Sequence, residues 1–190
     1  MNVSRITSLS LPAAAPSPCI GRFAPSPTGP LHFGSLLAAL ASYLDVRSRH
    51  GQWLLRIEDL DPPREDPDSV THILATLEAF GLEWDGAIRY QSQRGEAYRE
   101  FLENLQQKGL AFPCTCSRKQ LGQGLHSGRC HPDSQQQAAW RFLVGAGTVA
   151  HEDRLQGWQH FSLEQEIGDF VIRRRDLLWS YQLAVVCDDM

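Results

Sequence analysis

The sequence has no apolar run that approaches the roughly 20 residues needed by a membrane-spanning helix. It has no secretory apolar segment either, because serine and proline interrupt residues 6–18 before one develops. We therefore expect residues 1–18 to form a flexible tail and the protein to be cytoplasmic. In that reducing compartment its five cysteines are not expected to form disulfides.

An excess of positive charge is also missing, since the formal net charge is −4. Non-specific binding to nucleic acid depends on neutralising phosphates, so this balance excludes a chain that coats nucleic acid indiscriminately. Contact with RNA would need a local patch, for which Arg173, Arg174 and Arg175 are candidates; the alternative is an ordinary solvated run. With 190 residues, 42% of them hydrophobic, the chain can bury one sizeable core and a small appendage.

The sequence does have a run, from Arg22 to Ser35, in which three prolines and two glycines precede a helical pattern. Proline fixes φ and glycine releases it, so this segment can lead from a strand into a helix along a defined path. The free N–H groups of the helix would favour an anion at its first turn, where His32 could donate to a phosphate oxygen. The pattern indicates a nucleotide-phosphate site; the alternative is a proline-rich loop before an ordinary core helix.

Apolar periodicity predicts an α/β fold. Residues 19–24 and the nearly continuous apolar run 53–57 are typical of strands, the second buried on both faces of a parallel sheet. Three helices are predicted, with apolar positions at Leu36, Leu37, Leu40, Ala41 and Leu44, at Val70, Ile73, Leu74 and Leu77, and at Tyr98, Phe101, Leu102 and Leu105. The first is expected to reach about His50.

Glycines are expected to end these helices, at Gly51, Gly81 and Gly109, and Pro67 is expected in the first turn of the second helix. Strands that alternate with helices predict a doubly wound sheet of Rossmann type, with ligands outside the carboxyl ends of the strands. Arg22 and Glu58 fall at two such ends. An arginine can hold a carboxylate and a glutamate an ammonium group, so together they could orient an amino acid. The alternative is that they pair with each other or face water.

Four residues form a candidate metal site: Cys114, Cys116, His126 and Cys130. Three thiolates and one imidazole suit tetrahedral zinc, and the glycine-rich loop between them could bring them together. His131, next to Cys130, could replace His126 as the fourth ligand. Cys19 and Cys187 have no partner pattern and are expected to be buried thiols.

The run that contains His32-Phe33-Gly34-Ser35 resembles the signature of class I aminoacyl-tRNA synthetases, and within them the glutamate-activating branch. The resemblance covers about residues 19–189, and its matching runs follow one another in the same order as in the family. The further matching runs are residues 56–64, 84–86, 90–94, 169–176 and 181–189. The stretch 35–40 and the ending Asp61-Pro-Pro-Arg64 are similar to a short paralogue that transfers glutamate to queuosine in tRNA(Asp).

The resemblance implies a ligase in which glutamate attacks the α-phosphate of ATP, with Mg²⁺, and the glutamyl group passes to the queuosine of tRNA(Asp). It implies a monomer that binds glutamate, ATP, this tRNA and Zn²⁺. The implied catalytic residues are His32, Gly34 and Ser35, and the implied glutamate site comprises Arg22, Phe23, Ala24, Pro25, Ser26, Glu58 and Tyr181. Members of the family often have tyrosine where His126 stands.

The resemblance also implies a division of the chain. Residues 19–112 would be the first half of a Rossmann-type catalytic domain, 113–168 a zinc-binding, acceptor-like insertion, and 169–190 a return to the catalytic core. The Val-Arg-Gly segment and the Lys-Leu-Ser-Lys-like loop of the family do not occur in the sequence, so an incomplete, C-terminally truncated core is expected. An alternative is a catalytically silent, zinc-bearing remnant that binds nucleotide, amino acid or RNA.

Overall fold

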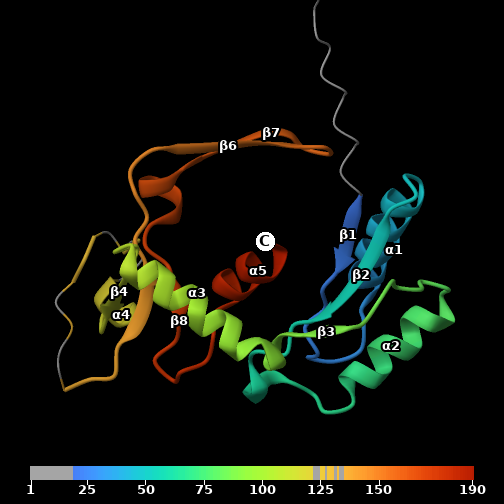
Figure 1. Ribbon diagram of the computed structural model, residues 1–190, viewed down its shortest axis with the longest axis horizontal. Helices are drawn as coiled ribbons and strands as arrows, with labels where there is room; N and C mark the ends of the chain where they lie inside the picture. The colour runs from blue at the N-terminus through green and yellow to red at the C-terminus, as the bar shows by residue number, and fades with distance from the viewer. Residues whose placement is uncertain (1–18, 122–124, 127, 131, 133–134) are drawn as a thin grey trace, which may run out of the picture.

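The computed structural model describes residues 19–121, 125–126, 128–130, 132 and 135–190. Its first sheet is parallel and has the order β1-β2-β3, with β1 at Ile20–Phe23, β2 at Gln52–Ile57 and β3 at Arg89–Tyr90. Helix α1 (Phe33–Arg47) connects β1 to β2, and α2 (Ser69–Ala79) lies between β2 and β3, after a short 3-10 turn η1 (Pro62–Arg64). Alternating strands and helices confirm the predicted α/β architecture (Figure 1).

Strand β2 is the centre of the first core. Trp53 is fully buried, stacks on Phe23 at 6.2 Å between ring centroids and meets the edge of Tyr43 at 5.2 Å. Its indole N–H donates to Ser42 Oγ at 2.9 Å, so the one polar atom of the ring is satisfied. Leu55 and Ile57 are also buried, which confirms the prediction of a strand enclosed in a parallel sheet.

Helix α1 differs from the prediction in which face it buries and where it ends. It ends at Arg47, three residues before His50, which has the left-handed φ of 53° and closes the turn. Leu37, Leu40 and Leu44 are exposed, while Ala39 and Val46 are the buried positions. The helix packs on the sheet through these smaller residues because Gly21 of β1 admits Val46: a Cβ on Gly21 would lie 2.3 Å from Val46 Cγ2.

The second and third helices agree with the predicted periodicity. Gly81 follows α2 with a φ of 67°, and Gly109 follows α3 (Gly95–Gln107) with a φ of 66°, the conformation that glycine permits at a helix end. Pro67 lies before the Asp68 N-cap rather than within the first turn of α2. A short 3-10 turn, η2 (Gln91–Arg94), leads directly from β3 into α3.

A second sheet follows in the order β4-β5-β8 and is antiparallel, with β4 at Ala111–Cys114, β5 at Ala139–Phe142 and β8 at Val171–Arg173. It packs with α3 and with α5 (Tyr181–Asp189) around a core that includes Tyr98, Leu102, Ile172 and Leu183. The short α4 (Arg118–Leu121) follows β4. None of the helices in the described part of the chain is long and apolar enough to cross a membrane.

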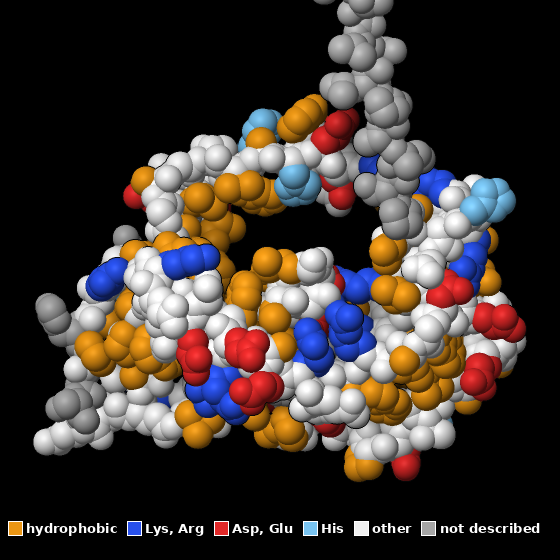
Figure 2. All heavy atoms as spheres, in the orientation of Figure 1, with side chains coloured by type: hydrophobic (Ala, Val, Ile, Leu, Met, Phe, Trp, Pro, Cys, Tyr) orange, Lys and Arg blue, Asp and Glu red, His pale blue; other side chains and the backbone are white. Residues whose placement is uncertain are grey.

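A two-stranded hairpin, β6 (Thr148–Asp153) and β7 (Gly157–Ser162), arches away from the second sheet (Figure 1). It returns to β8 through a single π-helical turn, η3 (Leu163–Ile167). Near its tip Arg154 reaches Asp45 of α1 with both terminal nitrogens, at 3.1 and 2.9 Å. Figure 2 shows the resulting opening between the hairpin and the rest of the molecule.

Replacing Gly51 with alanine should destabilise the fold. A Cβ at this position would lie 2.2 Å from the carbonyl oxygen of Cys19 and 2.8 Å from its Cβ, so the start of β1 would have to move. We expect a loss of about 1–3 kcal/mol in the free energy of unfolding, typical of overpacking. Gly145→Ala is the matched control because a Cβ there meets nothing within 4 Å. Equal urea midpoints for the two variants would contradict the prediction.

Candidate functional site

Charged side chains meet at the carboxyl ends of β1 and β2, where the sequence predicted a ligand site. Arg22 donates to Asp189 through Nε at 2.8 Å and through a terminal nitrogen at 2.5 Å. Arg56, buried at the end of β2, donates to Asp189 at 2.6 Å and to Glu58 at 2.9 Å. Arg22 and Glu58 therefore do not pair directly, because Asp189 and Arg56 lie between them.

The cluster is anchored by the neighbouring aspartate of α5. The side chain of Asp188 is completely buried. One carboxylate oxygen accepts from Gln91 Nε2 at 2.9 Å and from the Tyr98 hydroxyl at 2.8 Å, and the other accepts from Arg94 Nε at 3.0 Å. Arg89 also donates to the Asp188 carbonyl at 2.8 Å. These contacts fix the end of α5, and with it Asp189, against β3, η2 and α3.

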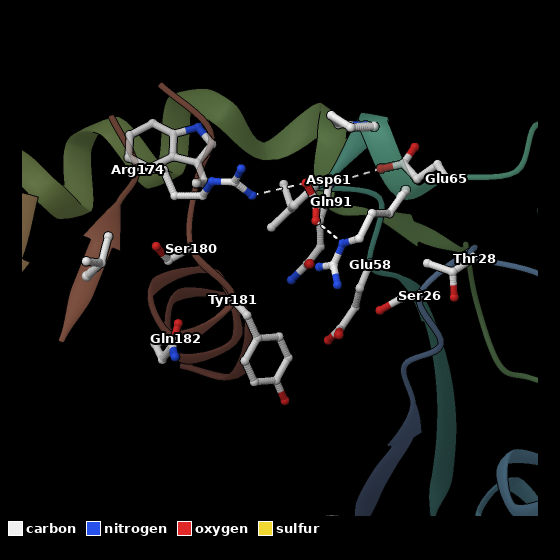
Figure 3. Close-up of a pocket in the computed structure, with 15 residues that line it drawn as sticks. Ser26, Thr28, Glu58, Asp61, Glu65, Gln91, Arg174, Ser180, Tyr181 and Gln182 are labelled. Carbon is white, nitrogen blue, oxygen red and sulfur yellow. Dashed lines mark hydrogen bonds and ion pairs between the residues drawn. The ribbon is translucent and has the colours of Figure 1, made fainter. Parts of the chain in front are cut away.

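Two cavities adjoin the charged cluster. The first, of about 700 Å³, is lined by Ser26, Glu58 and Tyr181 among others, and Figure 3 shows these three side chains around the same space. The second, of about 580 Å³, is lined by Arg22, Arg56 and Asp189. The Arg56–Glu58 ion pair connects them. Burial raises the pKa of the Glu58 carboxyl, against the lowering effect of Arg56.

The first cavity has an acidic and basic wall that the sequence analysis missed. Asp61 is bound by Arg64 and accepts from Arg174 at 3.0 Å, and its backbone N–H donates to Glu65 at 3.0 Å. Charge pairs of this kind leave no signal in a single sequence, because residues 61 and 174 are far apart along the chain.

The end of β1 and the loop after it contribute backbone and packing, rather than free side chains, at several of the predicted positions. Phe23 and Pro25 are buried and Ala24 is half-buried, whereas Ser26 is exposed to the first cavity. The Pro25 carbonyl accepts from the Glu58 N–H at 3.0 Å, which ties this loop to the end of β2.

The predicted catalytic residues lie at the N-terminus of α1. His32 is the N-cap, its Nδ1 accepts from the Ser35 N–H at 3.1 Å, and its Nε2 lies 3.1 Å from Ser35 Oγ. Gly34 gives the imidazole room, since a Cβ on it would lie 3.1 Å from His32 Cε1. All three residues lie outside the linings of the two cavities described above. His32 is exposed, and an imidazole held over a helix N-terminus can stabilise an anion there.

The four predicted metal ligands converge. The side-chain ligand atoms of Cys114, Cys116, His126 and Cys130 all lie within 4.8 Å of one another. His126 Nε2 is 3.4 Å from Cys114 Sγ, close to the ~3.6 Å that tetrahedral Zn–N and Zn–S bonds would require. The donor set and the spacing fit a structural zinc ion. His131, the other candidate for the fourth ligand, lies outside the described residues.

The cysteines of this cluster have unequal acidities. Burial acts to raise the pKa of Cys114, but hydrogen bonds from the Cys116 N–H and from Arg141 bring it below its usual value. Burial, with the hydrogen bond to Cys114, raises the pKa of Cys130 to about 11. The two remaining cysteines, Cys19 and Cys187, were predicted to be buried thiols; they are half-buried and pack against the two hydrophobic cores.

The arginine run 173–175 is engaged with the protein. Arg173 lies over the Trp179 ring at 4.7 Å, Arg174 pairs with Asp61 and with Asp176, and Arg175 donates to the Thr115 carbonyl. Each of the three cations therefore has a partner within the chain.

Comparison with known proteins shows the family of the chain. Residues 19–141 match the family described as tRNA synthetases class I (E and Q), catalytic domain. The chain belongs to this family, which confirms the resemblance and the fold class predicted from the sequence.

Individual relatives are more specific. The chain is 54% identical over 186 residues to the glutamyl-Q tRNA(Asp) synthetase of Dechloromonas aromatica, and 57% identical over 175 residues to that of Pseudomonas syringae pv. syringae. The matches include 91% and 90% of this chain but only 62% and 59% of the two relatives. The chain therefore spans about three fifths of their length.

Solved structures of glutamate-tRNA synthetases have a similar fold at lower sequence identity. The glutamate-tRNA synthetase of Elizabethkingia anophelis superposes with a TM-score of 0.80 at 25% identity, over 90% of this chain and 42% of that one. A glutamate tRNA ligase from Elizabethkingia meningosepticum, in complex with its amino acid, has a TM-score of 0.79 at 25% identity, over 90% of this chain and 41% of that one.

Proposed function

We propose that this chain is the substrate-binding portion of a ligase that activates glutamate with ATP and Mg²⁺ and transfers it to queuosine in tRNA(Asp). The observation that carries the proposal is the ordered series Arg22, Asp189, Arg56 and Glu58 beside a cavity lined by Ser26 and Tyr181. It combines a carboxylate-binding fork with a buried carboxylate, which are the two charges that recognise an amino acid. The choice of tRNA(Asp) as the acceptor of the glutamyl group is based on the names of the relatives.

The contact between Arg22 and Asp189 supports a carboxylate site. Two nitrogens of one guanidinium meet the two oxygens of one carboxylate, a geometry specific for arginine. A substrate carboxylate could take the same place if Asp189 turned to Arg56 alone. Glu58, on the other side of Arg56, would then hold the ammonium group.

In the activation step, His32 would stabilise the negative charge that develops on the α-phosphate of ATP. Its position at the N-terminus of α1 supports this role, because free N–H groups and the helix dipole favour the same charge. Gly34 would let the phosphate approach, and Ser35 would hold the imidazole in place. No covalent bond to the protein is needed, since proximity and charge stabilisation carry such reactions.

Cys114, Cys116, His126 and Cys130 would hold a structural zinc ion that orders the loop between β4 and β5. We propose that residues 113–168 form a zinc-binding, acceptor-like insertion between a first catalytic segment, 19–112, and a return, 169–190. The protein would act in the cytoplasm, where tRNA is modified, as a monomer.

Glutamate-dependent exchange between ATP and pyrophosphate tests the proposal. It should be measured on this chain and on this chain extended by the part of the Dechloromonas aromatica relative that it does not match. Exchange by either form supports the proposal, and exchange by the extended form alone makes this chain the binding portion only. If neither form catalyses exchange and calorimetry detects no binding of glutamate, the proposal is contradicted, and the alternative of a catalytically silent, zinc-bearing remnant is supported. Acylation of tRNA(Asp) with and without queuosine then tests the acceptor.

Binding of the substrate glutamate should weaken as the pH falls. The loss should begin at a higher pH than it would if the Glu58 carboxyl had its ordinary pKa. The folded-state pKa of Glu58 is raised, so its charge is lost early on acidification, and the substrate ammonium loses its partner. Titration calorimetry over a mildly acidic series measures this. In Glu58→Gln, binding should be weak at every pH tested; a pH dependence that survives in this variant would assign the effect to another group.

A further inference from the structure

We propose that Asp169 is the positioning residue of the metal site: it holds Nδ1 of His126 and thereby presents Nε2 to the metal. This inference rests on the proposed zinc site and adds to it a residue outside the four ligands. The distance between His126 Nδ1 and Asp169 Oδ2 is 3.2 Å, and both side chains are at least 95% buried.

The two nitrogens of the imidazole have different neighbours. Nδ1 faces the Asp169 carboxylate, and Nε2 faces the thiol cluster at 3.4 Å from Cys114 Sγ. An ionised carboxylate only accepts hydrogen bonds, so Nδ1 must carry the hydrogen and Nε2 is left with its lone pair. The carboxylate therefore selects the tautomer that a metal requires, and it also fixes the plane of the ring.

Asp169 is itself held in place by hydrogen bonds, so it can fix the orientation of the His126 ring. Its second carboxylate oxygen accepts from the Val144 N–H at 2.8 Å, and its own N–H donates to the His126 carbonyl at 2.7 Å. Arg141 of β5 donates to its carbonyl oxygen at 2.7 Å. Backbone and side chain of Asp169 thus fasten the ligand-bearing loop to strand β5 and to the segment that precedes β8.

Gly168 makes this close approach sterically feasible. Its φ is 62°, and a Cβ built on it would lie 2.7 Å from Leu125 Cβ and 2.9 Å from the His126 carbonyl oxygen. The loop that carries His126 therefore lies directly on the backbone before Asp169. A larger residue at 168 would push the imidazole away from the carboxylate.

Arg141 supplies the charge that the arrangement needs. Three thiolates and one Zn²⁺ carry a net charge of −1, and the nearby Asp169 carboxylate adds a second negative charge. Buried charges are tolerated when they are paired. Arg141 Nε lies 3.2 Å from Cys114 Sγ, while another nitrogen of the same guanidinium binds the Asp169 carbonyl. One arginine of β5 thus contacts both the ligand shell and the residue that orients it.

Asp169→Asn tests the inference because it keeps the shape of the side chain: with its amide oxygen accepting from Val144, it places an N–H₂ donor opposite Nδ1. We expect zinc affinity, measured by competition with a chelator, to fall about 10–100-fold. Glu103→Gln, the same charge change at an exposed site on α3, is the control and should bind zinc as the unaltered chain does. Unchanged affinity in a folded Asp169→Asn would overturn the inference.

A second measurement needs no variant and so is independent of folding defects. Long-range ¹H–¹⁵N correlation on the zinc-loaded, unaltered chain reports which imidazole nitrogen bears hydrogen and which binds metal. Hydrogen on Nδ1 and metal on Nε2 is the expected result, and metal on Nδ1 would overturn the inference while leaving the zinc site intact. Failure of the unaltered chain to bind zinc would overturn the metal site and this inference together, without bearing on the exchange reaction.

Discussion

Asp188→Ala should destabilise the protein by about 3–5 kcal/mol, the usual cost of removing one partner from a buried charge network. The side chain of Asp188 is fully buried and accepts three hydrogen bonds, from Gln91, Arg94 and Tyr98. Alanine would leave the Gln91 amide and the Tyr98 hydroxyl without that acceptor in the core. Since a domain is stable by only about 5–15 kcal/mol, the expected loss is a large part of the total.

Urea unfolding, followed by tryptophan fluorescence, measures the change. Asp188→Asn should lose less than Asp188→Ala because the amide oxygen can still accept from one or two of the donors. Glu103→Ala, a carboxylate removed from the exposed face of α3, should leave the midpoint nearly unchanged. A second test is the pair Asp188→Ala and Tyr98→Phe. Their effects should not add, because both remove the same hydrogen bond, and strict additivity would contradict the network.

The parts of the fold that depend on local pattern were predictable from the sequence. Helix α2 follows a 3.6-residue repeat of apolar side chains, and β2 follows an apolar run bounded by a glycine. Both patterns report burial directly, since each side chain position faces a fixed direction in its element. The convergence of Cys114, Cys116, His126 and Cys130 was predictable for a related reason, because their residue types and spacing, together with the family resemblance, indicate a ligand set.

Helix α1 shows where local pattern misleads. Its leucines made the most obvious apolar stripe, yet Leu37, Leu40 and Leu44 are exposed. The contact face was decided by Gly21, which lies on another element and lets Val46 come close to the strand. Periodicity in the sequence predicts that a helix has an apolar face, but it does not predict the shape of the surface against which the helix packs.

The site shows a second limit. The sequence placed Arg22 and Glu58 at neighbouring strand ends correctly, but it gave no indication that Arg56 and Asp189 connect them. Asp188 and Asp189 are adjacent in the chain, and helical geometry sends one into the core and the other to Arg22. The same holds for Asp169, which is 43 residues from His126. Long-range pairs of this kind depend on tertiary structure, which no single sequence reports.

His32→Ala should lower the rate of glutamate-dependent ATP–pyrophosphate exchange by about 10²–10³-fold, the usual cost of removing a donor from developing charge. The experiment uses whichever form, the chain or its extension, exchanges before substitution. The same substitution removes the N-cap of α1, because His32 Nδ1 accepts from the Ser35 N–H. Loss of a cap costs about 0.5–2 kcal/mol of stability, so a fall in rate by itself would not identify the role of the imidazole.

His32→Ser separates the two effects. Serine is a good N-cap and can accept from the same helix N–H groups, but it cannot reach a phosphate as the imidazole can. We expect its urea midpoint to match that of the unaltered chain while its exchange rate remains as low as that of His32→Ala. The exchange rate of Gly34→Ala should lie between that of the unaltered chain and that of the two His32 variants, since a Cβ there would lie 3.1 Å from His32 Cε1 and displace the ring without removing it. If His32→Ser restores exchange, His32 acts only as a helix cap. The binding of phosphate would then be assigned to the N–H groups of α1.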